Sequence, residues 1–128
     1  MAKRFVYADN AATTPLSKVA FEAMKPWLNE KWGNPSSIYG IARDARKAIE
    51  AARTDIAAAI GASPREIFFT SGGTESDNWA IKSAARAFQK KGRHLITSSV
   101  EHHAVSETME SLVSDGYEVT YLPVDKYG

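Results

Sequence analysis

The second half of the chain alternates strand-like and helix-like patterns, and this alternation limits the possible folds more than any other feature. Short β-prone runs at residues 66–70 (EIFFT), 94–99 (HLITSS) and 117–124 (YEVTYLPV) predict three strands. Between them, apolar residues at helical spacing predict two helices, one that ends near Gly92 and one that Gly116 closes. The order strand, helix, strand, helix, strand is typical of a parallel sheet with right-handed crossovers, so we predict an α/β fold.

Two further helices are predicted in the first half of the chain. Apolar residues recur at helical spacing over residues 16–30, where Ser17 is a candidate N-cap, and over residues 42–60, where Gly61 is a candidate C-cap. The segment between these helices, residues 32–40 (WGNPSSIYG), concentrates Gly, Asn, Pro and Ser, which favour turns. We predict an irregular loop there and treat it as a candidate functional loop.

Composition restricts the class of protein and its partners. At 128 residues, the chain is long enough for one domain with a modest core. Its 16 basic and 15 acidic side chains give a net charge of +1 without a dense basic tract, so we expect neither nucleic acid nor a membrane as a partner. No apolar run resembles a membrane span or a secretory signal, so we expect a cytoplasmic protein. The absence of cysteine excludes disulfides and a cysteine nucleophile supplied by these residues.

The turn SGGT, residues 71–74, is a candidate anion-binding site. A strand that passes through small residues into a helix leaves free backbone N–H groups at the helix start, where the helix dipole favours negative charge. Gly72 and Gly73 carry no Cβ to hold a phosphate away, and the Thr74 hydroxyl adds a donor. The alternative is a simple helix start in which Thr74 and Asp77 form a capping box. The segment matches neither G-x-G-x-x-G nor G-x-x-x-x-G-K-[ST], so nucleotides are not favoured.

A second candidate segment, SSVEHHAV, begins where the strand predicted at residues 94–99 ends. In an open parallel sheet, ligands bind outside the carboxyl ends of the strands, so this segment and the SGGT turn are expected at one edge. The imidazole of His102 or His103 can stack on a planar ring, transfer a proton near neutral pH or bind a metal. Because the chain has only His94 besides these two and no cysteine, we expect no metal site. The alternative for either histidine is a solvated or hydrogen-bonded residue at a helix start.

Four segments together resemble the cysteine desulfurase family, class-V enzymes that depend on pyridoxal phosphate: YADNAATTPL, GNPSSIYG, REIFFTSGGTESDNWAI and SSVEHHAV. They occur in the family's order and at its usual separations. The resemblance covers essentially the whole chain but only about the first third of a family member. It implies a partial fold-type-I transferase with a mainly parallel sheet and flanking helices. Residues 1–14 would belong to the family's small domain, and residues 15–128 would form the first part of its large, cofactor-binding domain.

The resemblance also assigns roles to individual residues. Gly73 and Thr74 match the pair that binds the phosphate of pyridoxal 5′-phosphate. His102 matches the histidine that stacks on the pyridine ring and takes part in acid–base steps, so it is the expected catalytic residue. Asn34 and Asn10 lie in segments that line the substrate entrance of the family. On this basis the SGGT turn is expected to bind phosphate.

The reaction implied by the resemblance removes sulfur from L-cysteine, giving alanine and a persulfide on an enzyme cysteine that supplies iron–sulfur cluster assembly. The cofactor is the electron sink, and the protein contributes orientation and electrostatics. These 128 residues contain neither the family's Ser-x-His-Lys-type motif, which carries the Schiff-base lysine, nor the persulfide cysteine. We therefore expect a truncated product, a fragmentary reading frame or one half of a split enzyme, which is inactive by itself.

Partners and alternatives follow from the same resemblance. In the family, the strand that matches residues 66–70 is separated from the next two by strands supplied later in the chain, so an isolated copy is expected to leave backbone groups and apolar faces uncovered. Expected partners are L-cysteine, a sulfur acceptor or scaffold protein, and either a second copy in a homodimer or a complementary chain. The alternatives are a selenocysteine lyase, another class-V aminotransferase, or a noncatalytic module that completes a partner chain.

Overall fold

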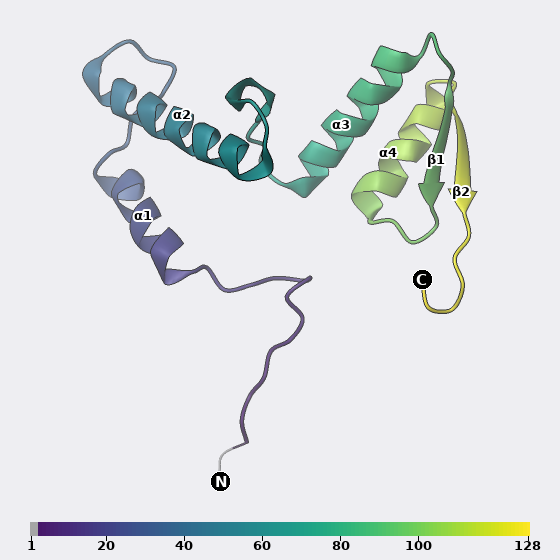
Figure 1. The fold of residues 1–128 in the computed structure, drawn as a ribbon, viewed down its shortest axis with the longest axis horizontal. Helices are drawn as coiled ribbons and strands as arrows, with labels where there is room; N and C mark the ends of the chain where they lie inside the picture. The colour runs from purple at the N-terminus through teal and green to yellow at the C-terminus, as the bar shows by residue number, and fades with distance from the viewer. Residues whose placement is uncertain (1–2) are drawn as a thin grey trace. The chain divides into compact units, whose positions relative to one another are not determined.

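The computed structural model describes residues 3–128 (Figure 1). In chain order, its elements are α1 (Lys18–Asn29), α2 (Gly40–Ile60), the 3-10 turn η1 (Pro64–Glu66), α3 (Gly73–Phe88), β1 (His94–Ser98), α4 (His103–Ser114) and β2 (Glu118–Leu122). They fall into two compact units, one that ends at Ile67 and one that spans Phe68–Gly128. The assignment of residues 1–14 and 15–128 to two family domains stays a prediction, and residues 1 and 2 lie outside the described residues.

Helix α1 forms where the apolar spacing predicts it. Ser17 is its N-cap, and the Ser17 Oγ accepts a hydrogen bond from the Ala20 N–H at 3.1 Å. No residue of α1 is buried, however, and Leu28 on its predicted packing face is 70% exposed. The spacing of α1 therefore predicted the helix correctly, but its apolar face is not covered within the described residues.

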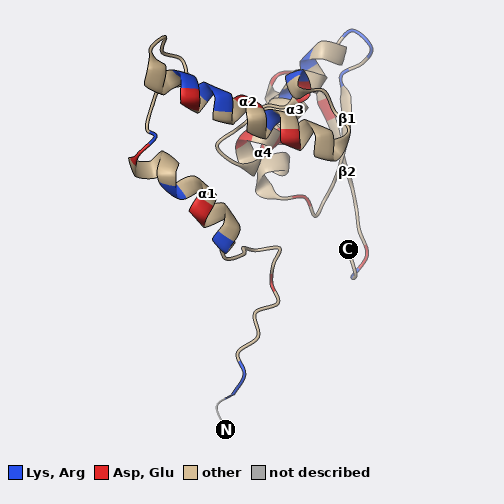
Figure 2. Ribbon diagram, turned by 60° about the vertical axis from the view of Figure 1, so that its left-hand side comes forward, with Lys and Arg blue, Asp and Glu red and all other residues tan. Residues whose placement is uncertain are grey.

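Helix α2 is longer and ends at the predicted C-cap. Gly61 adopts the left-handed conformation, with φ of 69°, and its N–H donates to the carbonyls of Ala57 and Ala58. The residues of α2 that are buried are Ala42, Ala45 and Ala57. The exposed side of the helix carries both signs of charge (Figure 2), from Arg43, Asp44, Lys47, Glu50 and Asp55 among others.

The second unit contains the parallel sheet. Strands β1 and β2 pair in register from His94 opposite Glu118 to Ser98 opposite Leu122, and α4 connects them. Helices α3 and α4 contact each other. A small core joins these elements, made of the buried residues Ala85, Leu112 and Tyr117 with Ile81 and Leu95 packed against them. The predicted α/β fold with a parallel sheet and flanking helices is confirmed.

Residues 66–70 do not form the predicted strand. Glu66 ends the turn η1, and residues 67–70 have no regular secondary structure although the backbone at Ile67 is extended, with φ of −97° and ψ of 126°. A strand needs an adjacent strand for its backbone hydrogen bonds, and the sheet of the described residues contains only β1 and β2. The aromatic pattern remains largely open to solvent, since Phe68 is 62% exposed and contacts Trp79 edge-on at 5.1 Å between ring centroids.

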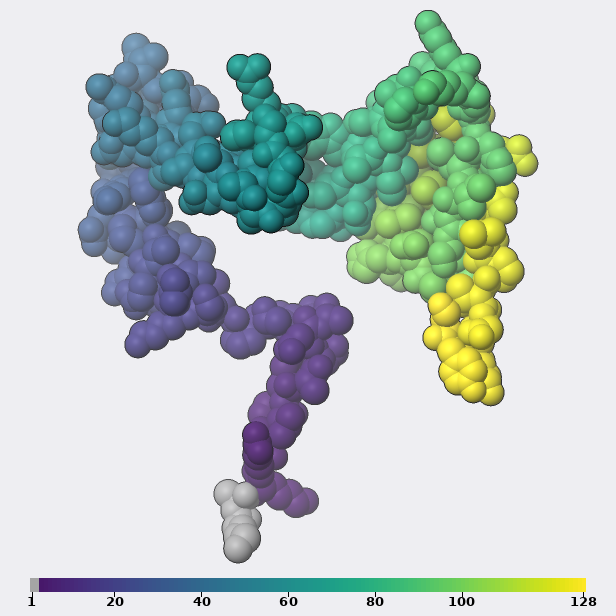
Figure 3. All heavy atoms as spheres, in the orientation of Figure 1, coloured from purple at the N-terminus to yellow at the C-terminus, as the bar shows by residue number. Residues whose placement is uncertain are grey.

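The segments at the two ends of the described residues lack helices and strands. Residues 3–17 precede α1 without a helix or strand and are all exposed (purple in Figure 3). Residues 123–128, yellow in the same figure, follow β2 and are exposed as well. Within residues 3–128, no helix combines the length and the apolar character needed to cross a membrane.

Candidate functional site

The SGGT turn leads directly into α3, and its two glycines are not explained by packing. Gly72 is the N-cap, with φ of 167° and ψ of 178°, an extended conformation that any residue adopts. A Cβ placed on Gly72 or Gly73 would meet no protein atom within 4 Å. Neither backbone strain nor crowding by the protein therefore requires glycine here. Close approach of a ligand to the backbone would require it.

The first turn of α3 presents free backbone donors. The Ser76 N–H donates to the Gly72 carbonyl at 3.2 Å, which is the first intrahelical bond at this end. Among residues 3–128, no hydrogen bond uses the N–H of Gly73 or of Thr74. These two N–H groups lie at the positive end of the helix dipole, so together they form a place where an anion can bind.

The capping box that the sequence offered as an alternative does not form. No side chain caps α3 at Gly72, and Thr74 lies inside the helix, where its carbonyl accepts a hydrogen bond from the Asn78 side chain at 3.0 Å. A capping box is found one element earlier, where Ser63 and Glu66 cap η1. The SGGT turn is instead held by the side chain of another residue in the first turn of α3, Glu75.

Glu75 and Ser76 fix the turn through side-chain hydrogen bonds. The Glu75 Oε2 accepts from the Ser71 N–H at 2.6 Å and from the Ser71 hydroxyl at 2.8 Å. The hydroxyls of Thr70 and Ser76 are 2.7 Å apart, and the Thr70 hydroxyl also donates to the Gly72 carbonyl at 3.2 Å. The backbone N–H of Ser71, followed by its hydroxyl, lowers the pKa of Glu75 below its ordinary value.

This set of contacts was not among the features predicted from the sequence. The signal that could have found it is the spacing of Ser71 and Glu75, four residues apart across the helix start. A carboxylate at that position can reach back to a donor that precedes the helix, just as in a capping box with one more residue. Sequence patterns for capping emphasise a spacing of three residues, which favours the pair Thr74 and Asp77 instead.

His102 is the N-cap of α4. Its Nδ1 accepts a hydrogen bond from the Ala104 N–H at 3.0 Å. Because Nδ1 is the acceptor, the proton of the neutral ring lies on Nε2. The ring is exposed, and its centroid is 6.2 Å from that of His103, with an angle of 61° between the ring planes. His102 is thus a hydrogen-bonded helix-start residue, as the alternative interpretation has it, and still presents an imidazole face and Nε2 to solvent.

The turn and His102 lie toward the same end of the second unit. Helices α3 and α4 pack on each other and run in the same direction, so both begin at the end where β1 finishes (Figure 1). This is the arrangement expected from ligand sites outside the carboxyl ends of parallel strands. The structure therefore brings Gly73, Thr74 and His102 to one end of a single unit.

Asn34 and Asn10 belong to the other unit. The Asn34 Oδ1 accepts a hydrogen bond from the Ser36 N–H at 2.9 Å, and its carbonyl accepts from the Ser37 N–H at 3.0 Å. The guanidinium of Arg46, on α2, donates to the carbonyls of Pro35 at 2.9 Å and Ser37 at 3.4 Å. The predicted loop is thus confirmed and is held by its own turn and by α2.

Asn10 lies in a turn before α1. The Ala12 N–H donates to the Asp9 carbonyl at 3.2 Å and to its carboxylate at 3.3 Å, which closes the turn around Asn10. The Asn10 side chain is exposed. This local structure agrees with a turn, and the substrate-facing role of Asn10 stays a prediction.

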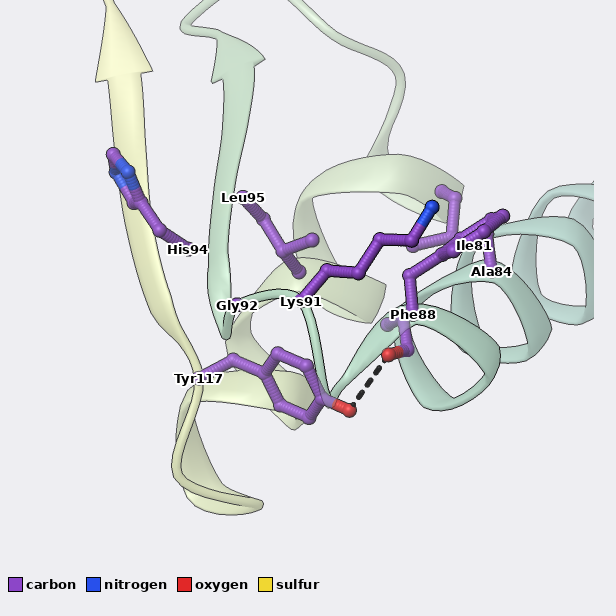
Figure 4. A pocket seen from close by; sticks show the side chains of 9 residues that line it. Ile81, Ala84, Phe88, Lys91, Gly92, His94, Leu95 and Tyr117 are labelled. Carbon is purple, nitrogen blue, oxygen red and sulfur yellow. Dashed lines mark hydrogen bonds between the residues drawn. The ribbon is translucent and has the colours of Figure 1, made fainter.

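A cavity of about 470 Å³ opens elsewhere in the second unit (Figure 4). Ile81, Phe88, Leu95 and Tyr117 supply its apolar lining, and the figure shows the Tyr117 hydroxyl bonded to the Ala85 carbonyl. Phe88 ends α3, about 22 Å along the helix axis from its first residue. This cavity is therefore separate from the SGGT turn. Among residues 3–128, no three His, Asp or Glu side chains cluster in a way that could hold a metal ion.

The sequence matches the class-V aminotransferase family over residues 6–128. It is 60% identical over 123 residues to the cysteine desulfurase IscS of Methanosarcina thermophila, and this match covers 96% of this chain and 30% of that protein. It is 62% identical over 126 residues to the cysteine desulfurase IscS of Dictyoglomus turgidum, and this match covers 98% of this chain and 32% of that protein. The chain thus spans about a third of the length of these relatives.

Solved structures agree with this match. A NifS-like protein superposes on 91% of this chain with a TM-score of 0.84 and 46% sequence identity. The protein SspA, in complex with cysteine, superposes on 91% of the chain with a TM-score of 0.82 and 47% identity. In these two cases the match covers 32% and 33% of the other chain.

Proposed function

Because this chain belongs to the class-V aminotransferase family, we propose that it supplies the part of a cysteine desulfurase that binds the phosphate and covers the ring of pyridoxal 5′-phosphate. Members of this family use that cofactor. Two relatives that are at least 60% identical are cysteine desulfurases, and the related SspA binds cysteine. L-cysteine is accordingly the proposed substrate of the complete protein.

The phosphate site is proposed at the start of α3, and one observation carries the proposal. The N–H groups of Gly73 and Thr74 form no hydrogen bond among the described residues, and no Cβ at Gly72 or Gly73 blocks the approach of a ligand. A phosphate here would accept from both N–H groups at the positive end of the helix dipole. The Thr74 hydroxyl would add a third donor.

His102 is proposed to face the ring and to move a proton. When bound, pyridoxal 5′-phosphate supplies the electron sink of the reaction. The bond from the Ala104 N–H holds Nδ1 and thereby orients the imidazole, which leaves the Nε2–H as the group that can donate a proton toward the substrate. Asn34, held in the loop by Arg46, and Asn10 are proposed to line the entrance for L-cysteine.

Several parts of the activity must come from elsewhere in the complete enzyme. The chain has no cysteine, so a persulfide must form on a cysteine supplied by another segment or chain. We propose that these 128 residues do not release sulfur from cysteine by themselves. A sulfur acceptor and a homodimer stay predictions drawn from the family, and a cytoplasmic location stays a prediction drawn from the sequence.

The phosphate site is testable on the chain itself. Backbone amide NMR during titration with inorganic phosphate, and separately with pyridoxal 5′-phosphate, is expected to shift the signals of Gly73 and Thr74 most. In the titration with inorganic phosphate, the Ala104 N–H at the start of α4 is an internal control because it is already bonded to His102. Inorganic phosphate shifts that are equal at both helix starts would contradict a specific site.

The proposed inactivity has its own test. Incubation of the purified chain with pyridoxal 5′-phosphate and L-cysteine is expected to release no sulfide above a blank without protein. Sulfide release that depends on the chain would contradict the proposal that the reaction needs a cysteine from another segment.

A further inference from the structure

We propose that Glu75 is a positioning residue for the phosphate site, because its carboxylate holds Ser71 and so keeps the SGGT turn in the conformation that leaves the N–H groups of Gly73 and Thr74 free. The inference rests on the proposed function and deepens it. It concerns a side chain that would not touch the phosphate itself.

The turn needs hydrogen bonds to support it because packing does not hold its backbone. Gly72 and Gly73 are adjacent glycines, and consecutive glycines give the chain its greatest conformational freedom. Both are exposed, and a Cβ on either would find only open space, so no packing contact restricts them. Hydrogen bonds from the flanking residues are therefore what defines the path of the turn.

Glu75 supplies the strongest of these hydrogen bonds. Its Oε2 accepts two donors from one residue, the Ser71 N–H at 2.6 Å and the Ser71 hydroxyl at 2.8 Å. Hydrogen bonds to an ionised acceptor are shorter and about twice as strong as neutral ones. Since Glu75 is anchored in the first turn of α3, this pair fixes the residue before the glycines relative to the helix after them.

A second contact supports the same geometry from the other side. The hydroxyls of Thr70 and Ser76 are 2.7 Å apart, and the Ser76 N–H donates to the Gly72 carbonyl at 3.2 Å. Two consecutive helix residues, Glu75 and Ser76, thus reach back to the two residues that precede the glycines. The N–H groups between these contacts are the ones left for a ligand.

The charge of Glu75 has the opposite effect on an anion. A carboxylate near a phosphate site repels the phosphate, although it also favours the helix start through the dipole. Glu75 therefore combines a geometric benefit with an electrostatic penalty. The two effects separate in two variants, since Glu75→Gln keeps an acceptor oxygen and removes the charge, whereas Glu75→Ala removes both.

The experiment measures inorganic phosphate affinity for the whole chain by amide NMR in four proteins: the original chain, Glu75→Gln, Glu75→Ala and Asp77→Ala. Asp77→Ala is the matched control, because it removes a carboxylate from the first turns of the same helix and the Asp77 side chain forms no hydrogen bond or ion pair among the described residues. We expect Glu75→Gln to bind phosphate as tightly as the original chain or more tightly. We expect Glu75→Ala to bind about tenfold more weakly, with Asp77→Ala unimpaired.

Hydrogen exchange of the Ser71 amide gives a second readout that needs no ligand. It is expected to be protected in the original chain and in Glu75→Gln, and unprotected in Glu75→Ala. If the original chain does not bind phosphate, the proposed phosphate site is wrong and this inference falls with it. If the original chain binds phosphate and Glu75→Ala matches it in both affinity and Ser71 exchange, only the role given to Glu75 is wrong. Circular dichroism of α3 and α4 in each variant separates a local effect from unfolding.

Discussion

The Tyr117 hydroxyl donates a hydrogen bond to the Ala85 carbonyl at 3.0 Å, and this bond ties the residue that precedes β2 to helix α3. Both residues belong to the core of the second unit, and each is only 5% exposed. The Arg93 guanidinium lies over the same ring, 4.6 Å from its centroid. Tyr117 therefore connects the strand layer to the helix that carries the candidate phosphate site.

Replacement of this hydroxyl is expected to destabilise the second unit. In Tyr117→Phe, the buried Ala85 carbonyl loses its partner while the ring still packs, so the free energy of unfolding should fall by about 1 kcal/mol. Urea unfolding followed by circular dichroism measures the change. Tyr127→Phe is the control, because Tyr127 is 83% exposed and should leave the transition where it is. Equal transitions for both variants would show that the bond to Ala85 contributes nothing.

Local features of this structure were largely predictable from the sequence. The apolar spacing located α1 and α2, and Ser17 and Gly61 marked the two boundaries because capping depends on residues close in the chain. The prediction of a strand at residues 66–70 was wrong because strand formation, unlike capping, does not depend only on residues close in the chain. A strand is defined by a neighbour that can be far away in the sequence, and residues 3–128 supply none beside this segment.

The candidate site shows the same division. The turn and the helix start around Gly73 followed from local chemistry, as did the end of the sheet at which His102 lies. The contact between Glu75 and Ser71 did not, because it depends on one side-chain conformation among several that the sequence allows.

His102 is expected to show separable roles in stability and in function. His102→Ala removes the cap of α4 and should lower the free energy of unfolding by about 1 kcal/mol, whereas His102→Asn keeps a capping side chain and should restore most of it. Neither variant retains an imidazole to face the cofactor ring. Both should therefore bind pyridoxal 5′-phosphate more weakly than the original chain while binding inorganic phosphate equally well.

Titration calorimetry with the two ligands tests this separation. A loss of inorganic phosphate binding in His102→Asn would indicate that the histidine acts on the SGGT turn. Unchanged binding of pyridoxal 5′-phosphate in both variants would contradict the proposed ring contact.

The contact between Glu75 and Ser71 should depend on pH with a defined sign. The pKa of Glu75 is lowered in the folded state, so the folded chain binds this proton more weakly than the unfolded chain does. The contribution of Glu75 is therefore fully present above the unfolded pKa, about 4.3, and is lost as the pH falls through the lower folded value. The chemical shift of the Ser71 amide proton should stay constant from pH 7 to about 5 and move below that.

Glu75→Gln identifies the titrating group in this experiment. Its Ser71 amide shift should not follow the acidic transition, because the amide side chain has no proton to gain in this range. The same transition in both proteins would assign it to another carboxylate.

Arg46 is expected to order the loop that holds Asn34. Its guanidinium donates to two carbonyls of that loop, so Arg46→Ala should speed hydrogen exchange at the Ser37 amide, which bonds to the Asn34 carbonyl. Arg46→Lys cannot reproduce the planar pair of donors and should be intermediate. Arg43→Ala, on the charged side of α2, serves as the control. Unchanged exchange in Arg46→Ala would show that the turn at Asn34 is sufficient by itself.

The two-stranded sheet has a consequence for how the purified chain behaves in solution. Among residues 3–128, β1 and β2 pair only with each other, so the outer side of each presents backbone groups to solvent, and Ile96 and Leu122 on these strands are 62% and 51% exposed. Such an edge is a template to which any compatible strand can add. These unpaired backbone groups would allow further strands to extend the sheet in a longer polypeptide. They also expose the chain alone to self-association, which is expected to increase with protein concentration.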